Sequence, residues 1–313
     1  MISKNILLTG GSGFLGTYIK DAFLSNNYLT YNIGRKPTIE ANHIICELSN
    51  SFPILPNIPF EKIIHIAGKA HVFPKTKEEE EEFYAVNAKG TENLLLGLSK
   101  LNKKPLQIVF ISTVAVYGKT EGMLISEDMP LEANTPYGIS KKQAEFLIID
   151  WCKKNNVSYL ILRLPLIAGE NPPGNLGDMK RTIGNGKYVN ISGNQSRKSV
   201  VIAKDIANLI VDISTDKTGI YNLTDGVHPS FNDIEKAIEY RLQKKIKISL
   251  PIWAIRPIAK VGDIMTNLLK KDMPISSVRL NKILSTLTFD DSKAVKFLNW
   301  RPNNSIDYIK HKL

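Results

Sequence analysis

The chain has 313 residues, enough for one large domain or two unequal ones with a sizeable core. Its two cysteines, Cys46 and Cys152, lie far apart and lack metal-site spacing, which argues against a disulfide framework and a zinc site and fits a reducing cytoplasm. The formal charge of +11 suits an anionic partner, but the basic residues are not interleaved with aromatic ones, so we do not expect nucleic acid binding.

Short apolar runs alternate with amphipathic segments up to about residue 165. The N-terminal MISKNILLTG holds an apolar run that is too short for a signal peptide or a membrane span, and it predicts the first strand. Helices are expected over 14–25, 77–101 and 137–155, with strands in LTYNI, KIIHIA, QIVFIST and SYLILRL. The pattern predicts an α/β fold with a Rossmann-type, doubly wound parallel sheet in a dinucleotide-binding domain over residues 1–165.

The rhythm changes after residue 165, where glycine and proline accumulate in AGENPPGNLG. Helices are predicted over 176–185, 204–214 and 231–243, with a short strand at VNIS. We expect a smaller, mostly helical substrate-binding lobe over 166–313, with segments such as 200–225 returning to the first domain. The acidic run EEEEE at 78–82 predicts a solvated helix start, which the helix dipole favours.

A glycine-rich loop follows the first predicted strand. In ILLTGGSGFLGTYI the spacing GxGxxG lies between a strand and a helix, as a dinucleotide site requires. Glycines let the backbone turn sharply and approach a pyrophosphate, which then sits at the N-terminus of the helix. The loop therefore predicts a bound dinucleotide.

The end of the second predicted strand bears on which dinucleotide binds. The segment reads YNIGRKP, so Gly34 stands at the position of the acidic residue that usually holds the ribose 2′-hydroxyl of NAD. Gly34 would leave room for a 2′-phosphate, and the guanidinium of Arg35 suits a phosphate well. We therefore expect NADP, with NAD as the alternative.

The segment TPYGISKK suggests a proton donor. Thr135 and Pro136 form a good helix start, so Tyr137 and Lys141 lie one turn apart on the same face. A nearby ammonium lowers the pKa of a phenol and makes it usable in acid–base chemistry. The hydroxyls of Ser112 and Thr113 end a buried strand, where doubly wound sheets bind ligands.

On these motifs the chain resembles the extended short-chain dehydrogenase/reductases, in the group of NAD(P)-dependent nucleotide-sugar epimerases and dehydratases. The resemblance covers nearly the whole chain and is carried by TGGSGFLG, IAGKAH, VNAKGT, STVAVYG, TPYGISK and LRLPLIAG. It implies three catalytic residues, Thr113, Tyr137 and Lys141. It also implies cofactor contacts by Gly10, Gly13, Phe14, Leu15, Gly16, Arg35, Glu47, Leu48, Ala67, Gly68, Lys69, Asn87, Ser112, Tyr137, Lys141 and Pro165.

The resemblance extends into the second lobe, with two informative departures. Val114 and Ala115 follow the catalytic threonine, where the 4,6-dehydratases of the group carry Asp-Glu, so we do not expect dehydration. Leu166 replaces an asparagine that is common in the epimerases, and AGKAHV, RLPL and SRKSVV are more similar to reductases of UDP-linked 4-keto-6-deoxy-hexosamines. The implied substrate-binding residues are Thr113, Asn175, Leu176, Arg197 and Lys198.

The expected function is accordingly NADP(H)-dependent reduction of a UDP-4-keto-6-deoxy-N-acetylhexosamine in the synthesis of surface polysaccharide precursors. Tyr137 would protonate the alkoxide that forms at C4, Thr113 would hydrogen-bond it, and Lys141 would hold the cofactor ribose and tune the phenol. One alternative is a nucleotide-sugar C4-epimerase that retains NAD. The other is a non-catalytic dinucleotide-binding scaffold, against which the intact catalytic set argues.

The apolar segment 250–271, LPIWAIRPIAKVGDIMTNLLKK, leaves two interpretations open. It is interrupted by charged residues too often for a membrane span. We prefer a helix that caps the sugar site, with contact to a membrane surface as the alternative. Relatives in this group often dimerise through helices of the first domain, so a homodimer is possible.

Overall fold

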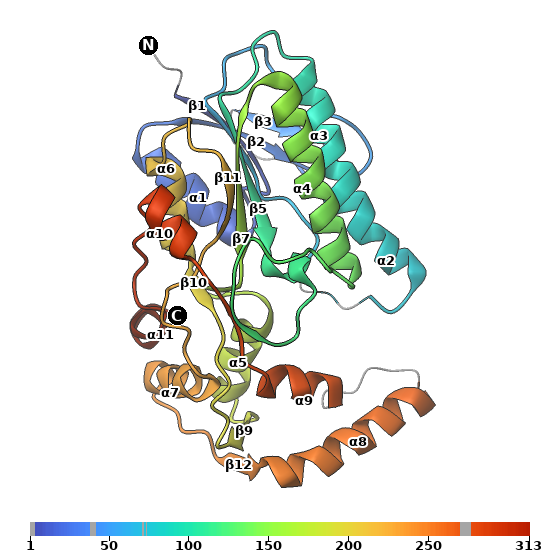
Figure 1. The fold of residues 1–313 in the computed structure, drawn as a ribbon, viewed down its shortest axis with the longest axis vertical. Coiled ribbons are helices and arrows are strands. Elements are labelled where there is room, and N and C mark those ends of the chain that lie inside the picture. Colours follow the sequence, from blue (N-terminus) through green and yellow to red (C-terminus); the bar gives the residue numbers. More distant parts are fainter. Residues whose placement is uncertain (1–3, 38–41, 71, 73, 270–276) are drawn as a thin grey trace.

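The computed structural model describes residues 4–37, 42–70, 72, 74–269 and 277–313. Its upper part in Figure 1 is built on a seven-stranded sheet with the strand order β11-β7-β5-β4-β1-β2-β3, in which all neighbouring strands are parallel. The strands are β1 (Asn5–Thr9), β2 (Leu29–Gly34), β3 (His43–Ile45), β4 (Lys62–His65), β5 (Gln107–Thr113), β7 (Ser158–Leu164) and β11 (Gly219–Asn222). The predicted α/β class and doubly wound parallel sheet are confirmed.

Helices cover both faces of this sheet (Figure 1). On one face lie α1 (Phe14–Ser25) and α6 (Ala203–Asp212), and on the other lie α3 (Gly90–Ser99) and α4 (Pro136–Asn155). Because it is covered on both sides, the central strand QIVFIST is buried at every position, which explains its nearly continuous apolar run. One hydrophobic core lies on each face of the sheet, and together they hold the strands in place. The ends of these strands carry the site.

The segment 77–101 is not the single helix that we expected. It consists of α2 (Lys77–Phe83), the π-helical turn η1 (Tyr84–Lys89) and α3. The acidic run starts α2 as predicted, because the Thr76 side chain caps the helix by accepting from the Glu79 N–H at 3.2 Å. The π turn is a local widening of the kind often found at functional sites, and it contains the buried Asn87.

Outside the parallel sheet, the described residues contain more short strands than predicted. Three parallel pairs link distant segments: β8 with β10, β9 with β12, and β6 with β13. Their bounds are β6 (Gly122–Ile125), β8 (Leu166–Ala168), β9 (Val189–Ser192), β10 (Val200–Ile202), β12 (Ile248–Pro251) and β13 (Leu287–Phe289). The predicted strand at VNIS is β9. The other five strands are three or four residues long, too short for the alternation of apolar and polar residues to reveal them.

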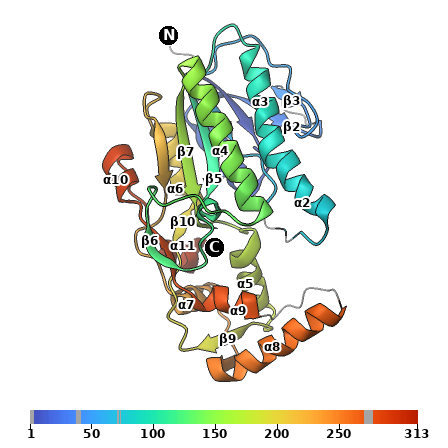
Figure 2. The ribbon, with the colours of Figure 1, turned by 45° about the vertical axis from the view of Figure 1, so that its right-hand side comes forward.

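Most of the remaining helices build the lower part of the molecule, whereas α10 lies beside α6 (Figures 1 and 2). They are η2 (Val114–Tyr117), α5 (Gly174–Gly184), α7 (Phe231–Leu242), α8 (Ile252–Leu269), α9 (Ser277–Leu284), α10 (Ser292–Leu298) and α11 (Ser305–Lys312). Strand β11 pairs with β7, and α6 packs against α1, so these late segments lie with the parallel sheet. The boundary at residue 165 stays a prediction. Within the described ranges, no helix is both long and apolar enough to cross a membrane.

Candidate active site

The glycine loop lies at a topological switch point of the sheet. The chain leaves β1 toward β2 on one side, whereas β4 pairs with β1 on the other side, so the loops after β1 and β4 diverge at one edge. Gly10 has a φ of +74°, and a Cβ there would lie 2.7 Å from the backbone nitrogen of Ala67. A Cβ on Gly16 would lie 2.0 Å from the carbonyl oxygen of Gly10. Only glycine fits these two positions.

The N-terminus of α1 is suited to an anion. Its N-cap, Gly13, offers no side-chain hydrogen bond, and the first turn contains no acidic residue. The positive end of the helix dipole therefore faces the loop without a protein carboxylate. Phe14 packs edge-on against Tyr18 at 5.7 Å between ring centroids, and Leu15 is buried in the core, so their predicted cofactor contacts would come from the backbone.

The adenosine end of the site differs from our expectation. A Cβ on Gly34 would lie 2.7 Å from Cε1 of His43, so the space that Gly34 was expected to leave is occupied by the His43 ring. The Nε of Arg35 lies 3.7 Å from Oε2 of Glu47. A 2′-phosphate placed on Arg35 would therefore meet a neighbouring carboxylate of like charge. Leu48 is buried, and its carbonyl accepts from Asn93 Nδ2 at 2.7 Å.

A buried hydrogen-bond chain ties the two loops together. The Thr9 hydroxyl and Nδ1 of His65 are 2.6 Å apart, and Nε2 of His65 is 2.8 Å from the hydroxyl of Thr91. Since the Thr91 hydroxyl donates to the carbonyl of Asn87 at 2.6 Å, it accepts from His65, which fixes the proton on Nε2. Burial lowers the pKa of His65 to about 3, with a smaller contribution from Lys141. This histidine is neutral and structural.

Asn87 joins this chain to α4. Its Oδ1 accepts from the Lys69 N–H at 2.7 Å, and its Nδ2 donates to the Ser140 hydroxyl at 2.9 Å. The Ser140 hydroxyl in turn donates to the carbonyl of Tyr137 at 3.0 Å. A Cβ on Gly68 would come within 3.0 Å of Asn87 Oδ1, so this loop also approaches closely. Asn87 therefore holds the loop of Ala67, Gly68 and Lys69 against α4.

The three predicted catalytic residues come together at the end of β5 and the start of α4. Thr135 caps α4 by accepting from the Gly138 N–H at 3.2 Å, which places Tyr137 and Lys141 in the first two turns. The Thr113 side chain hydrogen-bonds the Tyr137 phenol. Lys141 Nζ donates to the Ile111 carbonyl at 2.6 Å. The side chains thus form a compact hydroxyl, phenol and amine set beside the dinucleotide loops.

The pKa values of Tyr137 and Lys141 differ from what we expected from the sequence. Burial raises the pKa of Tyr137, and the hydrogen bond from Thr113 opposes this only in part. Burial also lowers the pKa of Lys141, to about 7, and Glu145 partly offsets this drop. The expected activation of the phenol therefore requires Lys141 to be protonated. An anionic cofactor near its ammonium would favour that form.

The predicted substrate residues of the second lobe are not all directed at a ligand. Lys198 Nζ donates to the carbonyls of Lys282 and Ser285 at 2.8 and 2.6 Å, so it caps the C-terminal end of α9. Arg197 donates to the carbonyl of His228 at 3.0 Å. Leu176 is buried in the core of the lobe, whereas Asn175 is exposed at the start of α5. Pro165 is half-buried between β7 and β8.

A family model for NAD dependent epimerase/dehydratase proteins matches residues 6–224, about two thirds of the chain. The chain belongs to this family. The match spans the glycine loop, the Asn87 turn and the catalytic set. The enzyme class expected from the sequence is therefore confirmed, whereas the reductase subgroup is not shown.

Relatives and solved structures agree with this membership. N-acetyl-alpha-D-glucosaminyl-diphospho-ditrans,octacis-undecaprenol 4-epimerase of Escherichia coli O157:H7 is 28% identical over 93% of this chain and 89% of its own. UDP-glucose 4-epimerase of Vibrio cholerae is 25% identical over 97% and 92%. UDP-glucose 4-epimerases of Thermotoga maritima, with UDP-glucose, and Thermus thermophilus, with NAD, give TM-scores of 0.73 and 0.72. At 17% and 18% identity, with 98% of this chain and 97% of each covered, these two show the fold.

The structure of this family member fits a bound dinucleotide. The loop after β1 has no space for a side chain at Gly10 or Gly16, and the uncapped start of α1 faces it. Gly10, Gly13 and Gly16 would hold the pyrophosphate, and Lys141 would hold the nicotinamide ribose. When bound, NAD supplies a hydride acceptor and donor at the sugar carbon.

Sequence reasoning missed a buried charge network beneath the catalytic set. Arg163 donates to Glu145 through Nε at 3.1 Å and Nη2 at 2.7 Å, and both side chains are about 2% exposed or less. Ser112, which we expected to contact the cofactor, instead donates its hydroxyl to Glu145 at 2.5 Å. Arg163 also donates to the Tyr117 hydroxyl at 3.0 Å. Glu145, one turn after Lys141, sustains the positive charge of that lysine.

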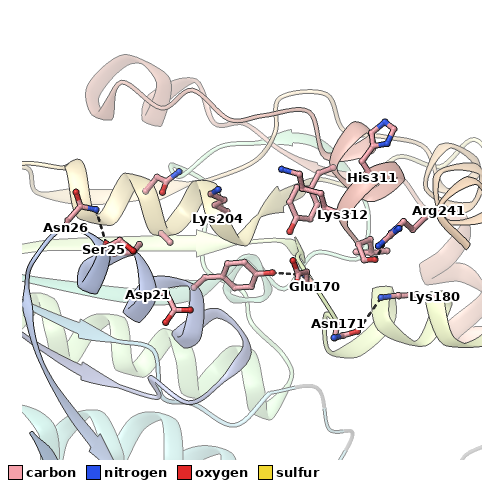
Figure 3. A pocket seen from close by; sticks show the side chains of 16 residues that line it. Asp21, Ser25, Asn26, Glu170, Asn171, Lys180, Lys204, Arg241, His311 and Lys312 are labelled. Atoms are coloured by element: carbon pink, nitrogen blue, oxygen red, sulfur yellow. Dashed lines mark hydrogen bonds between the residues drawn. The ribbon is translucent and has the colours of Figure 1, made fainter. Parts of the chain in front are cut away.

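A wide groove of about 900 Å³ lies on another side of the molecule from the predicted catalytic residues. It lies among α1, α6, α7 and α11, and none of the predicted catalytic residues lines it (Figure 3). Its wall contains both charge signs, with Asp21 and Glu170 against four Lys or Arg that include Lys204 and Lys312. The Glu170 N–H donates to the Tyr18 hydroxyl at 2.7 Å across it, which ties the second lobe to α1.

Proposed function

We propose that the protein is a 4-epimerase that retains NAD and acts on a sugar linked to a diphosphate. The observation that carries this proposal is the adenosine end of the site. Arg35 already faces the Glu47 carboxylate, and His43 occupies the space beside Gly34, so a 2′-phosphate would meet a carboxylate at Arg35 and an imidazole ring at Gly34. NAD fits this arrangement better than NADP. An enzyme that keeps NAD must return the hydride to the sugar from which it came.

The catalytic set has a defined task for each residue. Tyr137 takes the proton of the C4 hydroxyl as the C4 hydride leaves, and it returns the proton after the ketone has turned its other face. The Thr113 hydroxyl holds both the phenol and the sugar oxygen. Protonated Lys141 lowers the pKa of Tyr137 against the effect of burial. Asn87 and Ser140 keep Tyr137 in place through its own carbonyl.

The group to which the sugar is attached is the less defined part of the substrate. The Escherichia coli relative acts on a sugar joined by a diphosphate to undecaprenol, and the Vibrio cholerae relative on UDP-glucose. A hexose or N-acetylhexosamine on a diphosphate is common to both. We propose this unit as the substrate, with conversion at C4 as the reaction.

Reduction of a 4-keto sugar with NADPH is the second candidate. The absence of an acidic residue at Gly34, the basic Arg35 next to it and Leu166 in place of the epimerase asparagine favour it. Val114 and Ala115 after the catalytic threonine leave the protein without the acidic pair of the dehydratases, so a 4-keto sugar would have to be supplied. The Arg35–Glu47 ion pair weighs against this candidate.

One experiment separates the two. Purified protein is incubated with UDP-N-acetylglucosamine or its lipid diphosphate counterpart, without added cofactor, and the products are identified by NMR. We expect the C4 epimer to accumulate to an equilibrium ratio, with no change in reduced nicotinamide. Oxidation of added NADPH in proportion to product from a UDP-4-keto-6-deoxy-hexosamine, without epimer formation, would refute the epimerase proposal.

A further inference from the structure

Helix α8 has apolar residues on two opposite faces. Its inner face contains the buried Ile255 and Ala259, which pack in one cluster with Leu280 of α9 and Ile191 of β9. Its outer face is also apolar but exposed: Trp253 is 77% exposed, Ile264 58%, Val261 55%, Ile258 45% and Met265 38%. A helix needs only one apolar face to pack on its own lobe. The outer face is therefore not used in packing α8 on its lobe.

Positive charge borders this outer face. Arg256 and Lys260 are exposed on α8, three and seven residues after Trp253, which puts them at one edge of the apolar surface. Residues 244–265 contain five Lys or Arg and a single acidic residue, Asp263. Asp263 is half-buried, and its Oδ1 accepts from the Ser277 N–H at 2.9 Å. The surface is thus an apolar strip with a cationic border.

The position of α8 leaves this strip accessible. The helix lies across the end of the molecule opposite to the parallel sheet, with α9 on its inner side (Figures 1 and 2). It extends toward the side on which α2 lies, so it projects beyond the rest of the second lobe. Since the inner residues pack on α9 and β9, the strip faces away from the protein. The alternative in which α8 caps the sugar site does not account for this second face.

We propose that the outer face of α8 binds the surface of an anionic lipid bilayer. An indole is favoured at the headgroup level, and Ile258, Val261 and Ile264 can enter the upper acyl region while Arg256 and Lys260 meet lipid phosphates. A second copy of the chain is a worse partner. Pairing two such strips would bring cations together, with no exposed acidic side chain on the described part of α8 to neutralise them.

Membrane contact also bears on which group carries the sugar in the substrate. On a bilayer, the second lobe would be held where a polyprenyl diphosphate presents its sugar. This consequence rests on the proposed function, whereas the docking of α8 does not. The expected effect of docking is faster epimerisation of a lipid-linked sugar diphosphate in vesicles, with no effect on UDP-N-acetylglucosamine.

The test uses the full chain and vesicles of phosphatidylethanolamine and phosphatidylglycerol, compared with phosphatidylcholine, at about 0.15 M salt. Binding is measured by flotation and by tryptophan emission. Trp151 and Trp300 are only 9% and 3% exposed, so a blue shift on binding reports Trp253. We expect binding and a blue shift with the anionic vesicles. Absence of both would overturn the proposal.

Variants identify the surface. Trp253→Ser combined with Ile264→Ser should weaken vesicle binding on the order of tenfold or more, with an unchanged melting temperature and unchanged turnover of UDP-N-acetylglucosamine. Met123→Ser, which removes a 74% exposed apolar side chain on β6, is the matched control and should bind like the parent. Equal binding by parent and double variant would contradict the assignment, as would self-association that the double variant abolishes. Inactivity of the parent on every sugar would refute only the epimerase proposal.

Discussion

Replacing Lys141 by Met should make the ligand-free protein more stable and inactive. The ammonium is 4% exposed, and burial lowers its pKa from 10.5 to about 7. The unfolded chain therefore binds more protons than the folded chain between pH 7 and 10.5. By linkage, this lysine lowers the free energy of unfolding most below pH 7, and the penalty fades as the pH rises toward 10.5.

The size of the effect follows from the pKa difference. A lysine shifted from 10.5 to about 7 costs about 4 kcal/mol at pH 7 and about 1 kcal/mol at pH 9.5. Losing its hydrogen bond to the Ile111 carbonyl should cost about 1 kcal/mol at either pH. Lys141→Met should thus gain about 3 kcal/mol at pH 7 and almost nothing at pH 9.5.

Urea unfolding of cofactor-free protein at the two pH values measures this. Lys153→Met is the matched control, because Lys153 is an exposed lysine on the same helix, and it should change stability by less than about 0.5 kcal/mol at both. If Lys141→Met destabilises the protein at pH 7, or if its effect is the same at both pH values, burial of the Lys141 amine does not lower the free energy of unfolding as the structure indicates. Turnover should be lost in either case.

Four further outcomes are expected. Tyr137→Phe should keep NAD affinity but reduce turnover on the order of 10²–10⁴-fold in a steady-state assay, and a fully active variant would remove Tyr137 from the chemistry. Arg35→Ala should leave NAD preferred over NADP in fluorescence titration, whereas a large loss of NADP affinity alone would restore the phosphate-site interpretation. Asn87→Ala should weaken NAD binding and reduce turnover together, since it frees the Lys69 loop and the Tyr137 helix. Glu145→Gln should lower the pH above which activity falls, because it removes the negative charge that raises the pKa of Lys141. An unshifted pH profile would contradict this.

Much of the first domain could be predicted because its signals are local. The glycine spacing, the Thr135-Pro136 helix start and the buried run of β5 each depend on neighbouring residues, and all appear where expected. The break at η1 could not be predicted, since a single π turn shifts the apolar spacing over only six residues, which is too few to distinguish from an ordinary helix.

The parts of the site that were missed depend on contacts between distant residues. Glu145 and Arg163 are 18 positions apart and meet only because α4 crosses β7. The pairing of Thr9 with His65, and of Arg35 with Glu47, likewise exists only in the folded chain. For the same reason the sequence could not show that Lys198 is committed to carbonyls at the end of α9.

The most direct test of the central claim follows one atom. UDP-N-acetylglucosamine or the lipid-linked equivalent, carrying deuterium at C4, is incubated with the protein and an excess of unlabelled NADH, and the product is analysed by NMR and mass spectrometry. An epimerase that retains NAD returns the same hydride, so the C4 epimer should keep its deuterium. Epimer with hydrogen at C4, or deuterium recovered in the free cofactor, would contradict the account.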